Sequence, residues 1–185
     1  WQQESFVFGT RVELLISGVP EAKALAAGSQ VLAEFDRLHR TYHAWQPSAL
    51  SALNAAIAAG KPMEVSPEFA GYIRQLQQLA ADSDYLFDPG IGRLIALWGF
   101  QSDEFKTRLP DEAALAALTK QRPSIADIRL DGLRVTSRNP AVALDFGGYL
   151  KGVALDRAAQ ILRTAGIHNA LINIGGNVMA LGTKN

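Results

Sequence analysis

The sequence contains no cysteine, which excludes disulfides, thiol catalysis and cysteine-based metal sites within the chain. It also lacks a charge excess, because 18 lysines and arginines balance 18 aspartates and glutamates and no run of like charge occurs. A chain without such a field is a poor partner for nucleic acid or for an anionic membrane surface. No apolar run approaches the ~20 residues that span a bilayer.

The residues that are present predict a folded protein. The 185 residues are 48% hydrophobic, which is enough to build a core, and their number fits a single domain over 1–185. The first residues, Trp1–Ser5, are polar and neither begin with Met nor resemble a signal peptide. We therefore expect processing or trimming before Trp1.

The stretch from Val142 to Gly176 carries the strongest pattern. In order, it predicts a strand over 142–144, a glycine turn at 147–148, a helix over 152–165 with Gly166 as its left-handed cap, and a strand over 170–174. Asp145 and Lys151 flank the turn that feeds the helix. A helix start offers unpaired N–H groups and partial positive charge, so the turn suits a phosphate.

Two named motifs are excluded for this turn, and one plain alternative stays open. Asp145-Phe146-Gly147 spells a kinase DFG, but neither a G-x-G-x-x-G loop nor an H-R-D loop precedes it. The Walker pattern is also absent. Glycines beside a helix start are nevertheless common in mixed α and β domains, so spacing alone does not establish a phosphate site.

The remaining chain alternates between helix and strand patterns. It predicts a strand over 6–16, a helix from Pro20 to about Arg40, a short helical turn over 48–54, a helix after Ser66, a short buried helix within 91–100, a helix from Pro110 to about Gln121, a hairpin with an Asp-Gly turn over 128–135 and a strand over 177–181. These patterns predict the α+β class, with a mixed sheet and packed helices.

Two positions in predicted turns have a functional and a structural interpretation. Trp45 follows a helix in a polar turn, where an indole either stacks on a ligand or fills a gap against the core. Asp88 precedes Pro89 and a glycine, where it either contacts a ligand or forms an Asx turn. His39 and His43 lie four residues apart but lack a third ligand, so we interpret them as surface or turn residues.

Four blocks of the sequence together resemble the ApbE-type flavin transferases. The segment 145–152, DFGGYLKG, matches that family's D-x-G-G-x-x-K-G turn. Phe8-Gly9-Thr10, the segment 43–54 (HAWQPSALSALN) and the segment 87–100 (FDPGIGRLIALWGF) agree in order and spacing. The resemblance covers nearly the whole chain and implies an ApbE-like, T-fold-like architecture that is incomplete at its C-terminus.

The resemblance implies an enzyme that transfers the FMN half of FAD to a Thr or Ser hydroxyl of a partner flavoprotein and releases AMP, with Mg²⁺ as the divalent cation. It also implies a role for each matching residue. Asp145 is the expected catalytic residue, and the main-chain carbonyl of Gly148 is the expected metal ligand. The expected FAD-contacting residues are Phe8 (in place of the usual methionine), Trp45, Leu86, Phe87, Asp88, Asp145 and Lys151.

The second half of the family's domain, which supplies further metal ligands and a histidine near the phosphates, is not in this sequence. A flavoprotein-maturation or FAD-binding module without transferase activity, and an FAD pyrophosphatase, therefore stay open as alternatives. The resemblance also implies a periplasmic or cell-envelope location, with membrane anchoring through a segment absent here. The acceptor flavoprotein is not identified.

Overall fold

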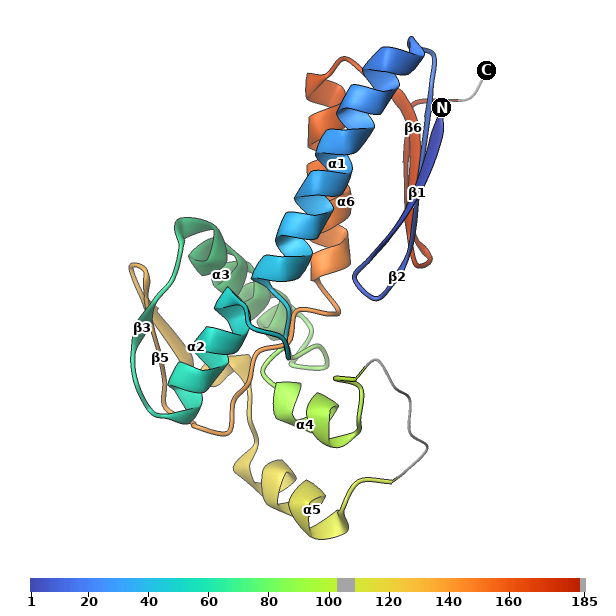
Figure 1. Ribbon diagram of the computed structural model, residues 1–185. Coiled ribbons are helices and arrows are strands. Elements are labelled where there is room, and N and C mark those ends of the chain that lie inside the picture. The colour runs from blue at the N-terminus through green and yellow to red at the C-terminus, as the bar shows by residue number, and fades with distance from the viewer. Residues whose placement is uncertain (103–108, 184–185) are drawn as a thin grey trace. The chain divides into compact units, whose positions relative to one another are not determined.

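The computed structural model describes residues 1–102 and 109–183. The chain divides into two compact units, one formed by Trp1–Thr41 with Gly147–Asn185 and the other by Tyr42–Phe146. The elements in chain order are β1 (Gln2–Val7), β2 (Thr10–Ser17), α1 (Glu21–Thr41), α2 (Ala49–Ala58), β3 (Met63–Glu64), α3 (Pro67–Asp82), α4 (Gly92–Leu97), α5 (Glu112–Gln121), η1 (Ile125–Asp127), β4 (Ile128–Asp131), β5 (Arg134–Ser137), α6 (Leu150–Thr164), β6 (Asn169–Ile174) and β7 (Asn177–Leu181) (Figure 1). The single domain over 1–185 stays a prediction.

The first unit is a four-stranded antiparallel sheet covered by two helices. Its strand order is β1-β2-β6-β7, and β2 pairs with β6 from Val12 with Ile174 to Ser17 with Asn169. Helices α1 and α6 pack against each other beside the sheet (Figure 1). Buried side chains alternate along the strands, as expected when one face meets helices and the other meets solvent.

The helices of this unit follow the predicted apolar spacing. Helix α1 buries Val31, Phe35 and Leu38 on one face. Helix α6 ends at Thr164, and Gly166 two residues later has a φ of +66°, which confirms the predicted left-handed cap. The indole of Trp1 lies over Gly28, where an added Cβ would come within 2.2 Å of the ring.

The single strand predicted over 6–16 is wrong, because the chain folds there into the hairpin β1–β2. The turn is formed by Phe8 and Gly9, which have φ values of +57° and +69°. Turns of this hand suit the twist of a hairpin, but their usual signal is Asn-Gly or Asp-Gly. Because phenylalanine occupies the first turn position, the sequence carries no recognisable turn signal here.

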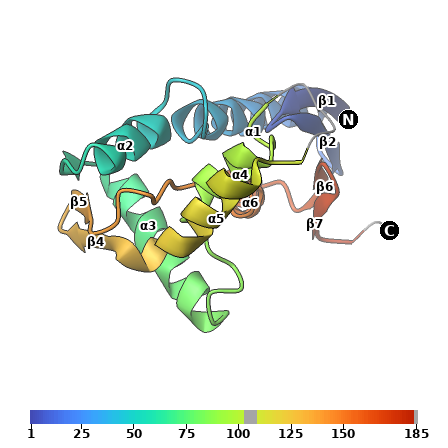
Figure 2. The ribbon, with the colours of Figure 1, turned by 90° about the horizontal axis from the view of Figure 1, so that it is seen from below.

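The second unit contains a small sheet and helices α2 to α5. The strand order is β3-β5-β4, and α3 lies beside this sheet (Figure 2). Gln77 of α3 donates a hydrogen bond of 2.8 Å to the carbonyl of Ile128, which ties the helix to the sheet. An aromatic cluster occupies the core and consists of Tyr42, Phe69, Tyr72 and Phe146. The predicted Asp-Gly hairpin is confirmed by the pairing of β4 with β5.

Two predictions for this unit need correction. Residues 142–144 do not form a strand, and only Ala143 makes an isolated parallel bridge, to Ile91. The predicted short helix is present as α4, but it is not buried: Gly92 is its one buried residue, and Trp98 directly after it is 45% exposed. The α+β class itself is confirmed by two sheets and packed helices.

Candidate functional site

Asp145 is held on an extended segment by neighbours from two directions. Its N–H donates a hydrogen bond of 2.9 Å to the carbonyl of Pro89. Its carboxylate oxygen Oδ2 accepts a hydrogen bond of 3.0 Å from Nε2 of Gln101. The side chain is half-buried. This carboxylate therefore follows a fixed backbone and accepts a hydrogen bond from a neutral side chain.

The residue before Asp145 is fixed by a side-chain amide from α2. Asn54 Oδ1 accepts a hydrogen bond of 2.7 Å from the N–H of Leu144, and Asn54 Nδ2 donates one of 2.9 Å to the carbonyl of Leu144. The amide thus pairs with both backbone groups of one residue, as a neighbouring strand would. Because the side chain of Leu144 is fully buried, the segment leading to Asp145 is anchored on both its backbone and its apolar side.

Asp88 binds backbone from two places in the chain. Its Oδ1 accepts hydrogen bonds from the N–H groups of Gly90, at 2.7 Å, and of Ile125, at 2.9 Å. The first is the Asx turn considered from the sequence. Gly90 must be a glycine here, because an added Cβ would lie 2.4 Å from the backbone nitrogen of Ile125. The carboxylate therefore has a structural task, and its cofactor contact stays a prediction.

Leu86 and Phe87 follow a strained turn at the end of α3. Asp84 and Tyr85 both have positive φ, at +51° and +60°, which is rare for a residue with a Cβ and rarer still for a bulky one. Leu86 is 94% exposed, an unusual position for a large apolar side chain. Strain of this kind gathers at sites of function, and here it presents an apolar side chain beside the Asp88 turn.

Trp45 lies in the loop that leads into α2 and is 44% exposed. This exposure favours the ligand-stacking interpretation over the gap-filling one. The second unit thus holds Trp45, Leu86, Phe87, Asp88 and Asp145. Through Pro89 and its neighbours it brings the 86–88 segment next to Asp145.

The other predicted residues belong to the first unit. Phe8 is half-buried in the β1–β2 turn, with its ring 6.1 Å from that of Phe35 and edge-on to His39 at 5.7 Å. The left-handed backbone of Phe8 is a second case of strain, and here the strained residue is itself a predicted site residue. Its ring is held against α1 although its backbone conformation suits glycine better.

Gly148 and Lys151 lie at the start of α6. Gly147 and Gly148 are exposed in a turn, and Lys151 is the second residue of the helix. No side chain caps this helix start through a hydrogen bond in the part of the chain that the structure describes. Exposed glycines, a helix start without a side-chain cap and a lysine are compatible with a phosphate, as the sequence predicts.

The fit to Mg²⁺ is partial. Mg²⁺ prefers six oxygen ligands in octahedral geometry, and the loop contains the carboxylate of Asp145 and the main-chain carbonyl of Gly148, an exposed residue. Within residues 1–102 and 109–183 no group of three or more His, Cys, Asp or Glu side chains is placed to hold a metal ion. The loop therefore suits one side of a metal–pyrophosphate complex and not a complete metal site.

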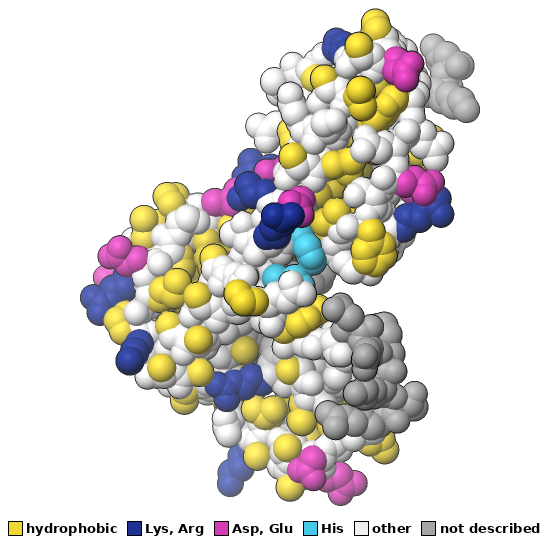
Figure 3. All heavy atoms as spheres, in the orientation of Figure 1, with side chains coloured by type: hydrophobic (Ala, Val, Ile, Leu, Met, Phe, Trp, Pro, Cys, Tyr) yellow, Lys and Arg dark blue, Asp and Glu magenta, His cyan; other side chains and the backbone are white. Residues whose placement is uncertain are grey.

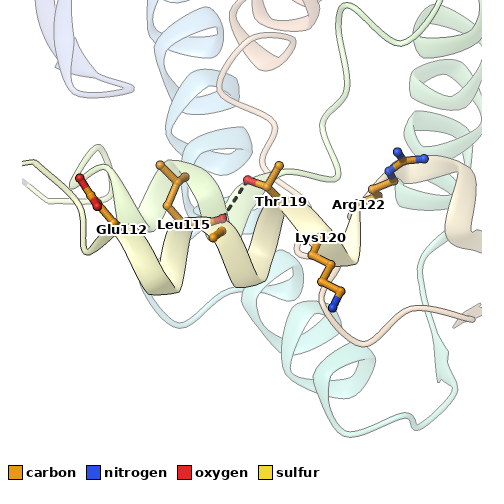
Figure 4. Close-up of a pocket in the computed structure, with 6 residues that line it drawn as sticks. Glu112, Leu115, Thr119, Lys120 and Arg122 are labelled. Atoms are coloured by element: carbon orange, nitrogen blue, oxygen red, sulfur yellow. Dashed lines mark hydrogen bonds between the residues drawn. The ribbon is translucent and has the colours of Figure 1, made fainter.

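A separate hollow lies along α5 and is lined by Leu115, Thr119, Lys120 and Arg122 among others (Figure 4). The hydroxyl of Thr119 donates to the carbonyl of Leu115 at 2.8 Å, as in many helices, and no predicted site residue lines the hollow. Hydrophobic side chains also reach the visible surface of the molecule as scattered groups (Figure 3). Scattered exposed apolar residues are normal and do not mark a site.

Sequence reasoning missed three residues that organise this region: Asn54, Gln101 and His43. Their hydrogen-bond partners are Leu144, Asp145 and the backbone of Trp45. For Asn54 and Gln101 the contacts join residues far apart in the chain, so no local pattern signals them. For His43 a signal existed, since a histidine two residues before an exposed tryptophan can bond to the loop backbone.

The ApbE family profile matches residues 8–185. Among curated proteins, an FAD:protein FMN transferase of Rhodobacter capsulatus is 44% identical over 96% of this chain and 34% of the relative. Another of that name, from Klebsiella pneumoniae, is 29% identical over 94% of this chain and 51% of the relative. The chain thus spans about one third to one half of the length of these relatives.

Among solved structures, the ApbE protein of Thermotoga maritima superposes with a TM-score of 0.89 at 28% identity. The match covers 100% of this chain and 59% of the Thermotoga maritima chain. The flavinyl transferase ApbE of Pseudomonas stutzeri gives a TM-score of 0.85 at 25% identity, over 100% of this chain and 61% of its own. The ApbE-like architecture predicted from the sequence is confirmed by these matches.

Proposed function

Because this chain belongs to the ApbE family, we propose that it is part of an FAD:protein FMN transferase that places FMN on a Thr or Ser hydroxyl of a partner flavoprotein and releases AMP. The carrying observation is the segment ending at Asp145, whose backbone is fixed by Pro89 and whose preceding residue is fixed by Asn54. A carboxylate held this firmly, followed directly by exposed glycines and an open helix start, is suited to phosphoryl transfer.

The proposed reaction exchanges one P–O bond for another. The hydroxyl oxygen of the acceptor attacks the phosphorus on the FMN side of the pyrophosphate, the bond from that phosphorus to the bridging oxygen breaks, and AMP leaves with the bonding electrons. The hydroxyl gives up its proton. Asp145 is the proposed acceptor or orienting partner for that hydroxyl. Lys151 and the start of α6 balance the phosphate charge.

The other matching residues are proposed to hold the dinucleotide. Trp45 offers an indole for stacking, Leu86 and Phe87 offer apolar contact, and Phe8 offers a ring from the β1–β2 turn. Asp88 shapes the 86–88 turn through its backbone hydrogen bonds and is expected to contact FAD with its remaining polar surface. Mg²⁺, with Gly148 and Asp145 among its proposed ligands, would neutralise charge on the phosphate oxygens.

A second function, FAD binding without transfer, is favoured by one observation. In the described residues no cluster of three metal-binding side chains is present. FAD binding without transfer does not require such a cluster, whereas metal-dependent transfer does. An FAD pyrophosphatase would use the same surface with water in place of the hydroxyl. The transfer assay below separates the three, because transfer, hydrolysis and binding leave different products.

The proposed location is the periplasm or the cell envelope, on the resemblance to the family alone. Among the described residues no helix combines the length and the apolar character needed to cross a bilayer. A membrane anchor, if one exists, is proposed to lie in a segment outside this sequence.

The central experiment compares transfer with and without the Asp145 carboxylate. We expect a version extended by the second half of the family fold to give fluorescent covalent FMN on a Thr-bearing acceptor, seen in-gel. Asp145→Asn, which is isosteric and still able to accept from Gln101, should lower the rate by about a hundredfold or more. Asp131→Asn, the same change at an exposed position in the β4–β5 hairpin, is the matched control. Undiminished transfer by Asp145→Asn would contradict the proposed role.

A further inference from the structure

The loop that leads into α2 is organised around the imidazole of His43. Its Nδ1 accepts hydrogen bonds from the N–H of Trp45, at 3.4 Å, and from the N–H of Gln46, at 3.2 Å. An imidazole nitrogen accepts only when it carries no proton, so the proton of the neutral ring lies on Nε2. One ring nitrogen therefore fixes the backbone of two consecutive residues.

The same ring also contacts the side chain of Trp45. The centroids of the His43 and Trp45 rings are 4.4 Å apart at an interplanar angle of 76°, which is the favourable edge-to-face arrangement. Trp45 nevertheless stays 44% exposed. His43 thus fixes both the backbone and the ring of a tryptophan that is not covered by the protein core.

The far end of the loop is closed by the N-terminus of α2. The hydroxyl of Ser48 donates to the carbonyl of His43 at 2.6 Å. Ser48 and Ser51 form a reciprocal capping box, since each side chain accepts a hydrogen bond of 2.9 Å from the other's N–H. The loop is therefore tied to a capped helix at one end and to its own imidazole in the middle.

We propose that His43 is a positioning residue that holds the indole of Trp45 in the orientation in which it stacks on FAD. The inference rests on the proposed function, because it assumes that Trp45 contacts the dinucleotide. His43 itself makes no contact with FAD in this proposal. Its effect is to order the loop before binding, so that less conformational entropy is lost when FAD arrives.

The test separates the acceptor from the ring. His43→Phe keeps an aromatic ring but removes the acceptor, whereas His43→Asn places its Oδ1 where Nδ1 lies and can accept from the same N–H groups. In the full chain, we expect His43→Phe to weaken FAD binding about three- to tenfold, the effect of a lost net hydrogen bond. His43→Asn should weaken FAD binding clearly less than His43→Phe does, because it keeps the hydrogen bonds and loses only the ring contact.

Flavin fluorescence titration with FAD gives the affinities, and Trp45→Ala in the same assay tests the assumption about Trp45. If Trp45→Ala binds as the wild type does, the proposed contact of Trp45 with FAD fails and the inference fails with it. If Trp45→Ala weakens binding but His43→Phe does not, the inference alone is overturned. Equal weakening by His43→Phe and His43→Asn would overturn the role of the acceptor.

Two further readouts report the loop directly. With Trp1 and Trp98 replaced by Phe, the emission of Trp45 should shift further to the red in His43→Phe than in His43→Asn, because only His43→Asn keeps the hydrogen bonds that order the loop. In the wild type, the ¹⁵N shift of His43 should show an unprotonated Nδ1, and a protonated Nδ1 would overturn the proposal. If His43→Phe does not fold, His43→Gln decides, because its longer side chain cannot keep the acceptor in place, and wild-type affinity there would overturn the inference.

Discussion

A single carboxylate, that of Asp88, joins two stretches of backbone that are 37 residues apart in sequence. Replacing it by alanine would leave the N–H groups of Gly90 and Ile125 without their acceptor. We expect Asp88→Ala to lower the free energy of unfolding by about 1–3 kcal/mol and Asp88→Asn, which keeps Oδ1, to lower it less. Urea unfolding gives the values. Asp156→Ala, at an exposed position, should change stability by less than about 0.5 kcal/mol, and an equal loss there would contradict the argument.

Trp45 is the residue for which binding and folding separate most cleanly. Because the side chain is 44% exposed, its removal should leave the fold intact. We expect Trp45→Ala to weaken FAD binding by about 1 kcal/mol, the scale of an aromatic stacking contact. Calorimetry measures the affinity and circular dichroism the fold. Leu133→Ala, a comparably exposed apolar residue at 40%, is the control. Collapse of the fold in Trp45→Ala would favour the gap-filling interpretation.

At the residue level the sequence predicted position better than role. The Asx turn of Asp88 follows from Asp-Pro-Gly chemistry and is confirmed. The exposure of Trp45 could not be predicted, since it depends on which segments cover the loop. The pairing of Asn54 with Leu144 joins residues 90 positions apart, and such a contact exists only after the chain has folded.

At the scale of elements, α2 links the loop of Trp45 to the segment of Asp145. Its N-terminus is capped by Ser48 and Ser51, and its Asn54 pairs with Leu144. Asn54→Ala would orphan two backbone groups, so we expect a loss of about 2–3 kcal/mol in unfolding free energy. Asn54→Asp keeps an acceptor for the N–H of Leu144 but sets an oxygen against its carbonyl, so it should also destabilise. Denaturant unfolding of both variants tests this, and wild-type stability of either would argue against the anchor.

The β1–β2 hairpin carries a second element-level prediction. In Phe8→Asn, relief of the left-handed strain at this position, about 1–2 kcal/mol, opposes the loss of ring contacts with Phe35 and His39. We therefore expect a small change in melting temperature together with weaker FAD binding. Thermal unfolding and an FAD titration provide the two measurements. A large gain in stability with unchanged affinity would mean that the ring of Phe8 does not contribute to FAD binding and that the residue only strains the turn.

The element patterns predicted most helices and strands, and the failures have local causes. The period of α1 and α6 and the cap at Gly166 were readable because core packing follows helical spacing. The hairpin at Phe8 was missed because its turn lacks the usual residues. Residues 142–144 read as a strand because they are apolar, yet their backbone partners are mainly a loop at 89–92 and the amide of Asn54.

At the scale of the whole molecule, the residues that the family resemblance singles out are divided between the two compact units. Phe8, Gly148 and Lys151 belong to the first, and Trp45, 86–88 and Asp145 to the second. The loop from Asp145 to Lys151 passes from one unit to the other between Phe146 and Gly147. Periodicity cannot predict such a division, and the resemblance to the family supplied these residues where patterns gave only candidates.

A dinucleotide site and a mononucleotide site predict different flavin preferences. If Trp45 and the start of α6 contact the parts of FAD that FMN lacks, FAD should bind more tightly than FMN. We expect at least about a fivefold difference, since one stacking contact of about 1 kcal/mol corresponds to that factor. Titration of the same protein with both flavins tests this, with Trp45→Ala as the variant that should narrow the gap. Equal affinities would remove the dinucleotide argument.

The last prediction concerns how much of the catalyst these residues supply. Mg²⁺ needs several oxygen ligands in fixed geometry, and the described residues contain no group of three metal-binding side chains. The relatives with solved structures extend well past the matched part, since the match covers 59% of the Thermotoga maritima chain. We therefore expect residues 1–185 alone, given Mg²⁺, FAD and a Thr-bearing acceptor peptide, to give no transfer, and the version extended by the second half of the family fold to give it.

The control for this experiment is FAD binding by both versions. If residues 1–185 bind FAD but do not transfer FMN, they have the binding surface and lack catalytic or metal-binding groups. In-gel fluorescence of covalently bound FMN measures transfer, and a Mg²⁺ titration shows whether a metal is required. Transfer by residues 1–185 alone would mean that Asp145 and Gly148, with the phosphates and water, already complete the metal site.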